Sequence, residues 1–177
     1  MTSNPLYAPW RIDYIRSIDK GEPGRCFLCD AANAATPEER RERLVLWQSA
    51  QSVVLINRYP YTNGHLLIAP RAHKADFEEL SPEELCDINV QTTAVLKLLK
   101  SAMSPQGFNV GINLGRAAGA GVPGHLHQHV VPRWAGDTNF MSVVGEVRIV
   151  PQAVEQLYEE LVRLRGAGGR ESDQRRP

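Results

Sequence analysis

The stretch GHLHQHVVPR, residues 124–133, contains three of the five histidines in this 177-residue chain, at every second position. Because side chains alternate between the two faces of an extended strand, we expect His125, His127 and His129 to project from one face in a row. Neighbours in that row would lie about 6.5 Å apart along the strand. Three imidazoles arranged in this way either bind metal or perform nucleophilic and acid–base chemistry on a substrate laid along the strand.

Three interpretations of this row compete. A single metal ion cannot bind all three histidines, because the outer two lie about 13 Å apart in a straight strand while Zn–N bonds are only ~2 Å long. A purely structural role is disfavoured for three histidines on one face beside the glycine-rich loop at residues 115–124. In the third interpretation one histidine is a nucleophile, and its neighbours orient it and contact the leaving group. Imidazole attacks phosphorus well, and backbone N–H groups of a glycine-rich loop approach anions closely, so this interpretation explains the most features.

The composition of the whole chain narrows the class of protein. Hydrophobic residues make up 42% and charged residues 23%, which is ordinary for a globular protein, and the length suits one domain. Lysine and arginine together number 20, as do aspartate and glutamate, so the basic excess of a sequence-independent nucleic-acid binder is missing. We find no apolar run as long as a membrane span and no signal-peptide core. Three cysteines make no disulfide framework, so we expect a cytoplasmic protein. From the balanced charge and the lack of a long apolar run, we expect no nucleic-acid partner and no membrane partner.

Hydrophobic patterning predicts an α+β fold, with an antiparallel sheet of about five strands and a long amphipathic helix packed on it. The helix covers residues 82–103 and begins at Ser81-Pro82-Glu83-Glu84, and we expect Cys86 within it to lie in the core. The Asn63-Gly64 turn signal joins two strands into a hairpin. The expected strands are residues 53–56, 65–69, 108–114 (one face buried), the histidine stretch and a short segment near 143–150; shorter helices are expected at residues 36–43 and from Pro151.

Three parts of the chain are expected to differ in organisation. Residues 1–20 predict an N-terminal arm, residues 21–165 a single domain, and the glycine-rich, charged residues 166–177 a disordered tail.

Cys26 and Cys29 form a C-x-x-C pair just after a Gly/Pro-rich segment. Such a pair places two sulfurs for one tetrahedral metal ion, usually zinc, but two more ligands must come from elsewhere. A redox pair would stand at the strand-to-helix junction of a thioredoxin-like unit, which we do not find. Two unrelated buried thiols are the remaining alternative.

Two patterns taken together resemble the histidine triad (HIT) superfamily of nucleotide hydrolases and transferases. They are His-x-His-x-His-x-x at 125–131 and, upstream, Asn57-x7-His65 within a Gly-His-Leu-Leu-Ile-Ala-Pro strand. The resemblance covers roughly residues 24–140 and implies a HIT-like fold. Three further segments look like the bacterial branch of diadenosine tetraphosphate phosphorylases: Ala8-Pro9-Trp10-Arg11, the Cys26/Cys29 pair and Gly121-Val122-Pro123-Gly124-His125.

The resemblance implies a catalytic role for three histidines. His127 matches the nucleophile that attacks the α-phosphorus and forms a nucleotidyl-histidine intermediate. His129 matches the residue that contacts the scissile phosphate and the leaving oxygen, and His65 matches an upstream histidine that supports the triad.

The resemblance also implies substrate and metal contacts. Asn57 matches a ribose-holding residue and Asn113 a phosphate-contacting residue, while the backbone around Gly121 and Val122 would cradle the α-phosphate. The ligands of a structural zinc would be Cys26, Cys29, His73 and His125, which leaves no open coordination position.

Two departures from the family pattern affect this expectation. Val122 stands where many relatives have a serine or threonine whose hydroxyl helps the leaving group, which weakens a plain phosphoramidase assignment. Gln128 replaces an apolar residue between the second and third histidines, and we expect it to face the other side of the sheet.

The activity implied is phosphorolysis of diadenosine tetraphosphate to ATP and ADP, with inorganic phosphate as the acceptor and the protein as a homodimer or dimer-based oligomer. Within enzymes, the alternatives are a dinucleoside polyphosphate hydrolase and a nucleoside phosphoramidase of the same superfamily. From another class, the alternative is a zinc-stabilised nucleotide-binding module.

Overall fold

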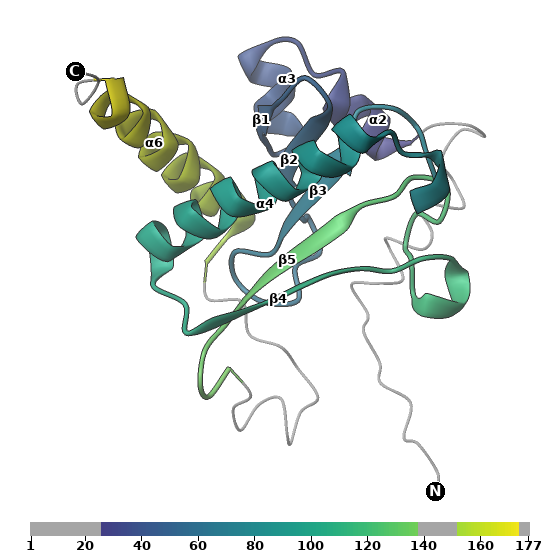
Figure 1. The fold of residues 1–177 in the computed structure, drawn as a ribbon. Coiled ribbons are helices and arrows are strands. Elements are labelled where there is room, and N and C mark those ends of the chain that lie inside the picture. Colours follow the sequence, from purple (N-terminus) through teal and green to yellow (C-terminus); the bar gives the residue numbers. More distant parts are fainter. Residues whose placement is uncertain (1–25, 138–151, 174–177) are drawn as a thin grey trace, which may run out of the picture.

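The computed structural model of the protein describes residues 26–137 and 152–173 (Figure 1). The arm expected at residues 1–20 and the strand expected near residues 143–150 lie outside the described residues. In the described part, no helix has both the length and the apolar character needed to cross a membrane.

Within the described ranges, five strands form one antiparallel sheet in the order β1-β2-β3-β5-β4. The strands are β1 (Val45–Gln48), β2 (Ser52–Ile56), β3 (Leu66–Pro70), β4 (Gly107–Ile112) and β5 (Gln128–Arg133). The α-helices are α2 (Phe27–Ala32), α3 (Pro37–Glu42), α4 (Pro82–Met103) and α6 (Val154–Asp173), and short 3-10 helices occur at η1 (Phe77–Glu79) and η2 (Arg116–Ala118). The expected α+β architecture is confirmed.

The long helix α4 packs on one face of the sheet (Figure 1). A capping box starts it: the Ser81 hydroxyl accepts from the backbone N–H of Glu84, and the Glu84 carboxylate accepts from the backbone N–H of Ser81. Its Val95 is fully buried in the core between helix and sheet. Gln128 of β5 points to this same face, as expected, and its Nε2 donates to Thr92 Oγ1 of α4 at 2.6 Å.

A second, smaller core lies on the other face of the sheet, under α2. Leu28 and Ala31 of α2 pack there with Val53 of β2 and Leu67 of β3, and all four are buried. Helix α2 and helix α4 therefore cover opposite faces of the sheet. A side chain of β5 that points away from α4 lies on the α2 face. This face carries the candidate site.

The histidine stretch differs from its expected form, because β5 begins only at Gln128 and contains His129 alone of the three histidines. His129 pairs with Leu67 of β3. Before the strand, the backbone N–H of Leu126 donates to the carbonyl of Lys74 at 2.6 Å instead of continuing the ladder with β3. A regular strand through all three histidines is therefore wrong, but the alternation of side chains is kept, because Leu126, Gln128 and Val130 all lie on the α4 face.

Two further expectations from the sequence are corrected. Cys86 is exposed, because it lies two residues from the buried Ile88 and hence about 200° around α4 from it. The tail expected to be disordered from residue 166 is helical as far as Asp173, since extending an existing helix costs far less than starting one.

Strand β4 forms one edge of the sheet and is less buried than its alternating pattern predicts. Phe108 and Ile112 are partly covered, but Val110 and Leu114 are 46% and 43% exposed. The apolar stripe of this strand therefore reaches beyond the cover that α4 provides.

Candidate active site and metal centre

The fold brings three histidines together at the junction of β3 and β5. His65 immediately precedes β3, His129 lies in β5, and His127 lies two residues before it. The ring centroids of His65 and His129 are 5.1 Å apart, and those of His127 and His129 are 5.0 Å apart. The three expected catalytic side chains thus form one cluster.

His127 is buried and has a defined hydrogen-bond partner for one ring nitrogen. Its Nδ1 lies 2.8 Å from the carbonyl oxygen of His125. A carbonyl oxygen can only accept, so Nδ1 carries the proton and Nε2 keeps its lone pair when the ring is neutral. Burial lowers the pKa of His127, and this effect outweighs the hydrogen bond, which alone would raise it. The lowered pKa favours the neutral ring that a nucleophile needs.

His65 and His129 are joined directly, with His65 Nε2 2.9 Å from His129 Nδ1. Burial, and then the nearby His129 and His127, lower the pKa of His65 to about 3. Burial and then His127 lower the pKa of His129 to about 4. Both rings are therefore neutral near pH 7. The Nε2 atom of His129 is buried and makes no hydrogen bond to the part of the chain that the structure describes.

Asn57 contacts His65 through its side-chain amide, with Nδ2 3.2 Å from His65 Nδ1. The same His65 nitrogen accepts the backbone N–H of Tyr61 at 3.1 Å. The Tyr61 ring lies over both imidazoles, with centroids 4.6 Å from His65 and 5.9 Å from His129. Sequence reasoning missed Tyr61; an aromatic residue inside the loop between Asn57 and His65 was the signal available.

The loop that carries Tyr61 is held close to the domain by a glycine. Gly64 has φ +79°, and a Cβ at this position would lie 2.7 Å from Met103 Sδ and 3.0 Å from Pro132 Cγ. Glycine therefore meets both a conformational and a steric demand in the turn just before His65.

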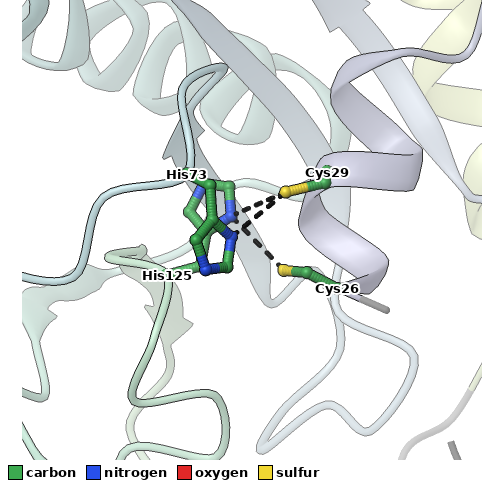
Figure 2. Close-up of side chains that lie close together, drawn as sticks. All are labelled: Cys26, Cys29, His73 and His125. Carbon is green, nitrogen blue, oxygen red and sulfur yellow. Dashed lines mark hydrogen bonds between the residues drawn. The ribbon is translucent and has the colours of Figure 1, made fainter. Parts of the chain in front are cut away.

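Four residues expected as metal ligands meet at the start of α2 (Figure 2). They are Cys26, Cys29, His73 and His125, and one donor atom from each lies within 4.8 Å of the others. Cys26 Sγ is 3.3 Å from His125 Nδ1, and Cys29 Sγ is 3.2 Å from His73 Nδ1 and 3.5 Å from His125 Nδ1. The edges of a tetrahedron with metal bonds of 2.0–2.3 Å measure about 3.3–3.8 Å, so these three distances are close to the edges of a tetrahedral site.

The orientation of the His125 ring also suits metal binding. Its Nε2 lies 2.9 Å from the carbonyl oxygen of Pro70 and must donate to it, which leaves the lone pair of Nδ1 directed at the cysteines. His125 is fully buried, whereas His73 is exposed. The two thiolates and two imidazoles fit zinc, with all four positions supplied by the protein.

The remaining expected site residues are Asn113, Gly121 and Val122. Asn113 is half-buried and directly follows β4, and Gly121 is exposed. Val122 packs against the core under α2, and its carbonyl accepts from the backbone N–H of His125 at 3.3 Å. No hydrogen bond within the described ranges links Asn113 or Gly121 to the histidine cluster, so their contacts with a phosphate stay predictions.

A salt bridge supports the loop that carries His73. Lys74 Nζ donates to Glu84 Oε2 at 2.6 Å, and Glu84, in the first turn of α4, is buried. The carbonyl of Lys74 accepts from Leu126, between the first two triad histidines. Sequence reasoning missed this pair, because the capping box explains Glu84 at the start of α4 and gives no sign of its contact with Lys74.

The geometry agrees with a match to a family model: the HIT domain covers residues 38–136. The chain belongs to the HIT domain family. Its relatives include the AP-4-A phosphorylase of Mycobacterium tuberculosis, 34% identical over 154 residues, which span 83% of this chain and 76% of the relative. They also include adenosine 5'-monophosphoramidase hnt1 of Schizosaccharomyces pombe, 30% identical over 136 residues, which span 77% and 95%. These HIT relatives are nucleotide-processing enzymes.

Solved HIT structures have the same fold. A Zn-bound histidine triad family protein from Mycobacterium smegmatis superposes with a TM-score of 0.59 at 24% identity, covering 80% of this chain and 96% of that chain. At this identity the likeness establishes the fold of the HIT domain.

Proposed function

We propose that the protein is a nucleotidyltransferase that cleaves dinucleoside polyphosphates through a nucleotidyl-histidine. The observation that carries this proposal is the hydrogen bond between His127 Nδ1 and the His125 carbonyl, which leaves Nε2 of a neutral, buried imidazole as the nucleophile. In the first step, Nε2 forms a bond to the α-phosphorus while the bond from phosphorus to the bridging oxygen breaks. With diadenosine tetraphosphate, ATP leaves and an adenylyl group stays on His127.

Inorganic phosphate then attacks the adenylyl phosphorus, His127 leaves with its lone pair, and ADP is released. The similarity to the AP-4-A phosphorylase supports phosphate as the acceptor. Asn57 is proposed to hold the ribose and Asn113 a phosphate oxygen, and the backbone around Gly121 and Val122 is proposed to cradle the α-phosphate. His129 is proposed to contact the leaving oxygen, with His65 behind it.

The four-residue metal centre is proposed to hold a structural zinc. The tetrahedral distances and the two-thiolate, two-imidazole donor set support zinc, and four protein ligands leave no position for substrate. When bound, the metal would fix α2 to the loop that begins the histidine stretch; the chemistry at phosphorus belongs to the histidine cluster.

We further propose a cytoplasmic homodimer. The support for a dimer is a set of exposed apolar side chains: Val110 in the edge strand β4, Leu114 two residues after its end, and Val90, 56% exposed on α4. The support for the cytoplasm is the cysteine usage, three free thiols of which two belong to the metal centre.

The covalent intermediate tests the proposal directly. The protein is mixed with diadenosine tetraphosphate without phosphate, quenched with denaturant and measured by intact-protein mass spectrometry. We expect one adenylyl group per chain, mapped to His127, and none in His127→Ala, with Gln128→Ala as a neighbouring control that keeps the adduct. Turnover without an adduct, or turnover retained in His127→Ala, contradicts the mechanism; nucleotide binding without turnover supports the binding module.

The reaction products show whether phosphate or water accepts the nucleotidyl group. ATP plus ADP formed only with added phosphate supports the phosphorylase, whereas ATP plus AMP, or two ADP, without phosphate supports a hydrolase. The similarity to adenosine 5'-monophosphoramidase makes adenosine 5'-phosphoramidate the second substrate to measure.

A further inference from the structure

A chain of hydrogen bonds runs from Asn57 through His65 to His129 and ends at a buried nitrogen. Asn57 Nδ2 is 3.2 Å from His65 Nδ1, and His65 Nε2 is 2.9 Å from His129 Nδ1. His129 Nε2, on the far side of the last ring, is buried without a protein partner in the described part of the chain. A buried polar atom of this kind costs free energy unless a ligand satisfies it.

The direction of the first link follows from the backbone. The N–H of Tyr61 donates to His65 Nδ1 at 3.1 Å, and a backbone N–H can only donate. Asn57 Oδ1 accepts the backbone N–H of Tyr59 at 3.0 Å, so its amide group is turned with Nδ2 toward His65. Two donors therefore point at His65 Nδ1, and this nitrogen carries the lone pair.

The second link then has only one arrangement. A neutral imidazole has one N–H, so His65 carries its proton on Nε2 and donates to His129 Nδ1. His129 in turn carries its proton on Nε2, which therefore offers an N–H. The neighbouring His127 has the opposite arrangement, with its proton on Nδ1 and its lone pair on Nε2. One ring of the pair is set as a nucleophile and the other as a hydrogen-bond donor.

We propose that two donors at His65 Nδ1, the backbone N–H of Tyr61 and the amide of Asn57, together fix the tautomer of His129 through His65, so that His129 Nε2–H donates to the bridging oxygen of the leaving nucleotide. This rests on the proposed nucleotidyl transfer. As the bond from His127 to phosphorus forms, the electron pair of the breaking P–O bond goes to the leaving oxygen, and the hydrogen bond from His129 stabilises that charge. The proton stays on His129, because a polyphosphate is a stable anion. Val122 has no hydroxyl to offer this oxygen, which increases the weight on His129.

A matched pair of substitutions distinguishes this role from ribose binding. Asn57→Asp places an acceptor against His65 Nδ1 and therefore opposes the tautomer in which His65 is protonated on Nε2. Asn57→Ala leaves the Tyr61 N–H as the sole donor to Nδ1 and preserves that tautomer. For Asn57→Asp we expect kcat to fall by about 100-fold, the order of losing one donor to a developing charge, with KM changed less than about threefold. For Asn57→Ala we expect a fall in kcat of less than about tenfold. The reverse ranking, with Asn57→Ala raising KM and Asn57→Asp nearly active, overturns the proposal and supports ribose binding.

The tautomers themselves are read by NMR, independently of turnover. Long-range ¹H–¹⁵N spectra of the folded, zinc-loaded protein with labelled histidine, assigned with His129→Gln and His65→Gln, report which ring nitrogen is protonated. We expect His65 and His129 protonated on Nε2 in the wild type and in Asn57→Ala, and a shift of both toward Nδ1 in Asn57→Asp. His129 protonated on Nδ1 in the wild type overturns the proposal even if the adenylyl adduct forms. The expected tautomers without any adduct leave the hydrogen-bond chain intact and contradict the proposed function instead.

Discussion

The imidazole of His65 is fully buried, and both of its ring nitrogens form hydrogen bonds inside the protein. Protonating it would place a positive charge in the interior, next to two more imidazoles. Its pKa is held near 3 in the folded state, against an ordinary value of 6.5. The cluster therefore links the charge state of the site to the stability of the fold.

This link predicts acid sensitivity. Because the unfolded chain binds the proton at a higher pH than the folded chain does, the stabilising effect of a neutral His65 is complete above about pH 6.5 and is lost as the pH falls toward 3. Urea unfolding between about pH 4 and pH 7 should give a free energy that falls with decreasing pH. In His65→Gln this dependence should be weaker, by up to about 1.4 kcal/mol per pH unit. Equal slopes in the two proteins would contradict a buried neutral His65.

Residue identities predicted most members of the histidine cluster but not the hydrogen bonds that connect them. The spacing of the histidines and the family pattern were enough to group His127, His129 and His65. They were insufficient for Tyr61, because its contribution is a main-chain N–H that any residue but proline supplies. The prediction that Cys86 lies in the core was wrong for a related reason. The identity of a cysteine in a helix does not show whether it faces solvent until the buried positions of that helix are known.

At the scale of elements, the four-residue metal centre joins three segments that are far apart in the sequence. Cys26 and Cys29 belong to the start of α2, His73 to the loop after β3, and His125 to the stretch before β5. Helix α2 has only six residues and no side-chain hydrogen bond at its N-cap, so it gains little stability from its own backbone. A metal ion bound to all four ligands would tie α2 to two loops and hold it on the sheet.

Removing one ligand should therefore release metal and destabilise the domain. We expect Cys26→Ser to lose stoichiometric zinc by elemental analysis and to lower Tm, at about 2–4 °C per kcal/mol of stability lost. The matched control is Cys86→Ser, which removes an exposed thiol of α4 outside the centre and should change neither quantity. One zinc per chain in Cys26→Ser would refute the proposed ligand set.

The sequence predicted the regular elements well where a local signal was present. The capping box at Ser81 and the two apolar strands on either side of Gly64 lie close to where they were expected. The start of β5 was not predictable in this way, because it depends on the hydrogen bond from Leu126 to the Lys74 carbonyl, between segments about fifty positions apart. Similarly, the exposed side of β4 depends on how far α4 reaches over the sheet, which is a tertiary property.

At the scale of the whole molecule, strand β4 is an edge of the sheet and carries an exposed apolar side chain within the described residues. Val110 pairs with the buried Val130 and so shares its face, but it lies beyond the cover of α4. A second copy of the chain placed against β4 would cover it and also occupy the free backbone groups of an edge strand. This is the basis of the proposed homodimer.

The dimer can be tested with a charge placed on that surface. Val110→Asp should shift the mass measured by light scattering from dimer to monomer, because a carboxylate buried in an apolar interface lacks a partner. Val162→Asp, at a position 39% exposed on α6, is the control and should leave the mass unchanged. A wild-type monomer, or a Val110→Asp dimer as tight as the wild type, would contradict this interface.

His125 has two proposed roles, and they are carried by two different groups of the residue. Its imidazole belongs to the metal centre, while its carbonyl oxygen holds the proton on His127 Nδ1. Every amino acid carries that carbonyl, and the neighbouring Leu126 is held separately by Lys74. A substitution at position 125 that fills the same buried space would remove a proposed metal ligand and still keep the acceptor for the proposed nucleophile. The proposed metal binding and the proposed catalysis can therefore be separated by mutation, although they meet at one residue.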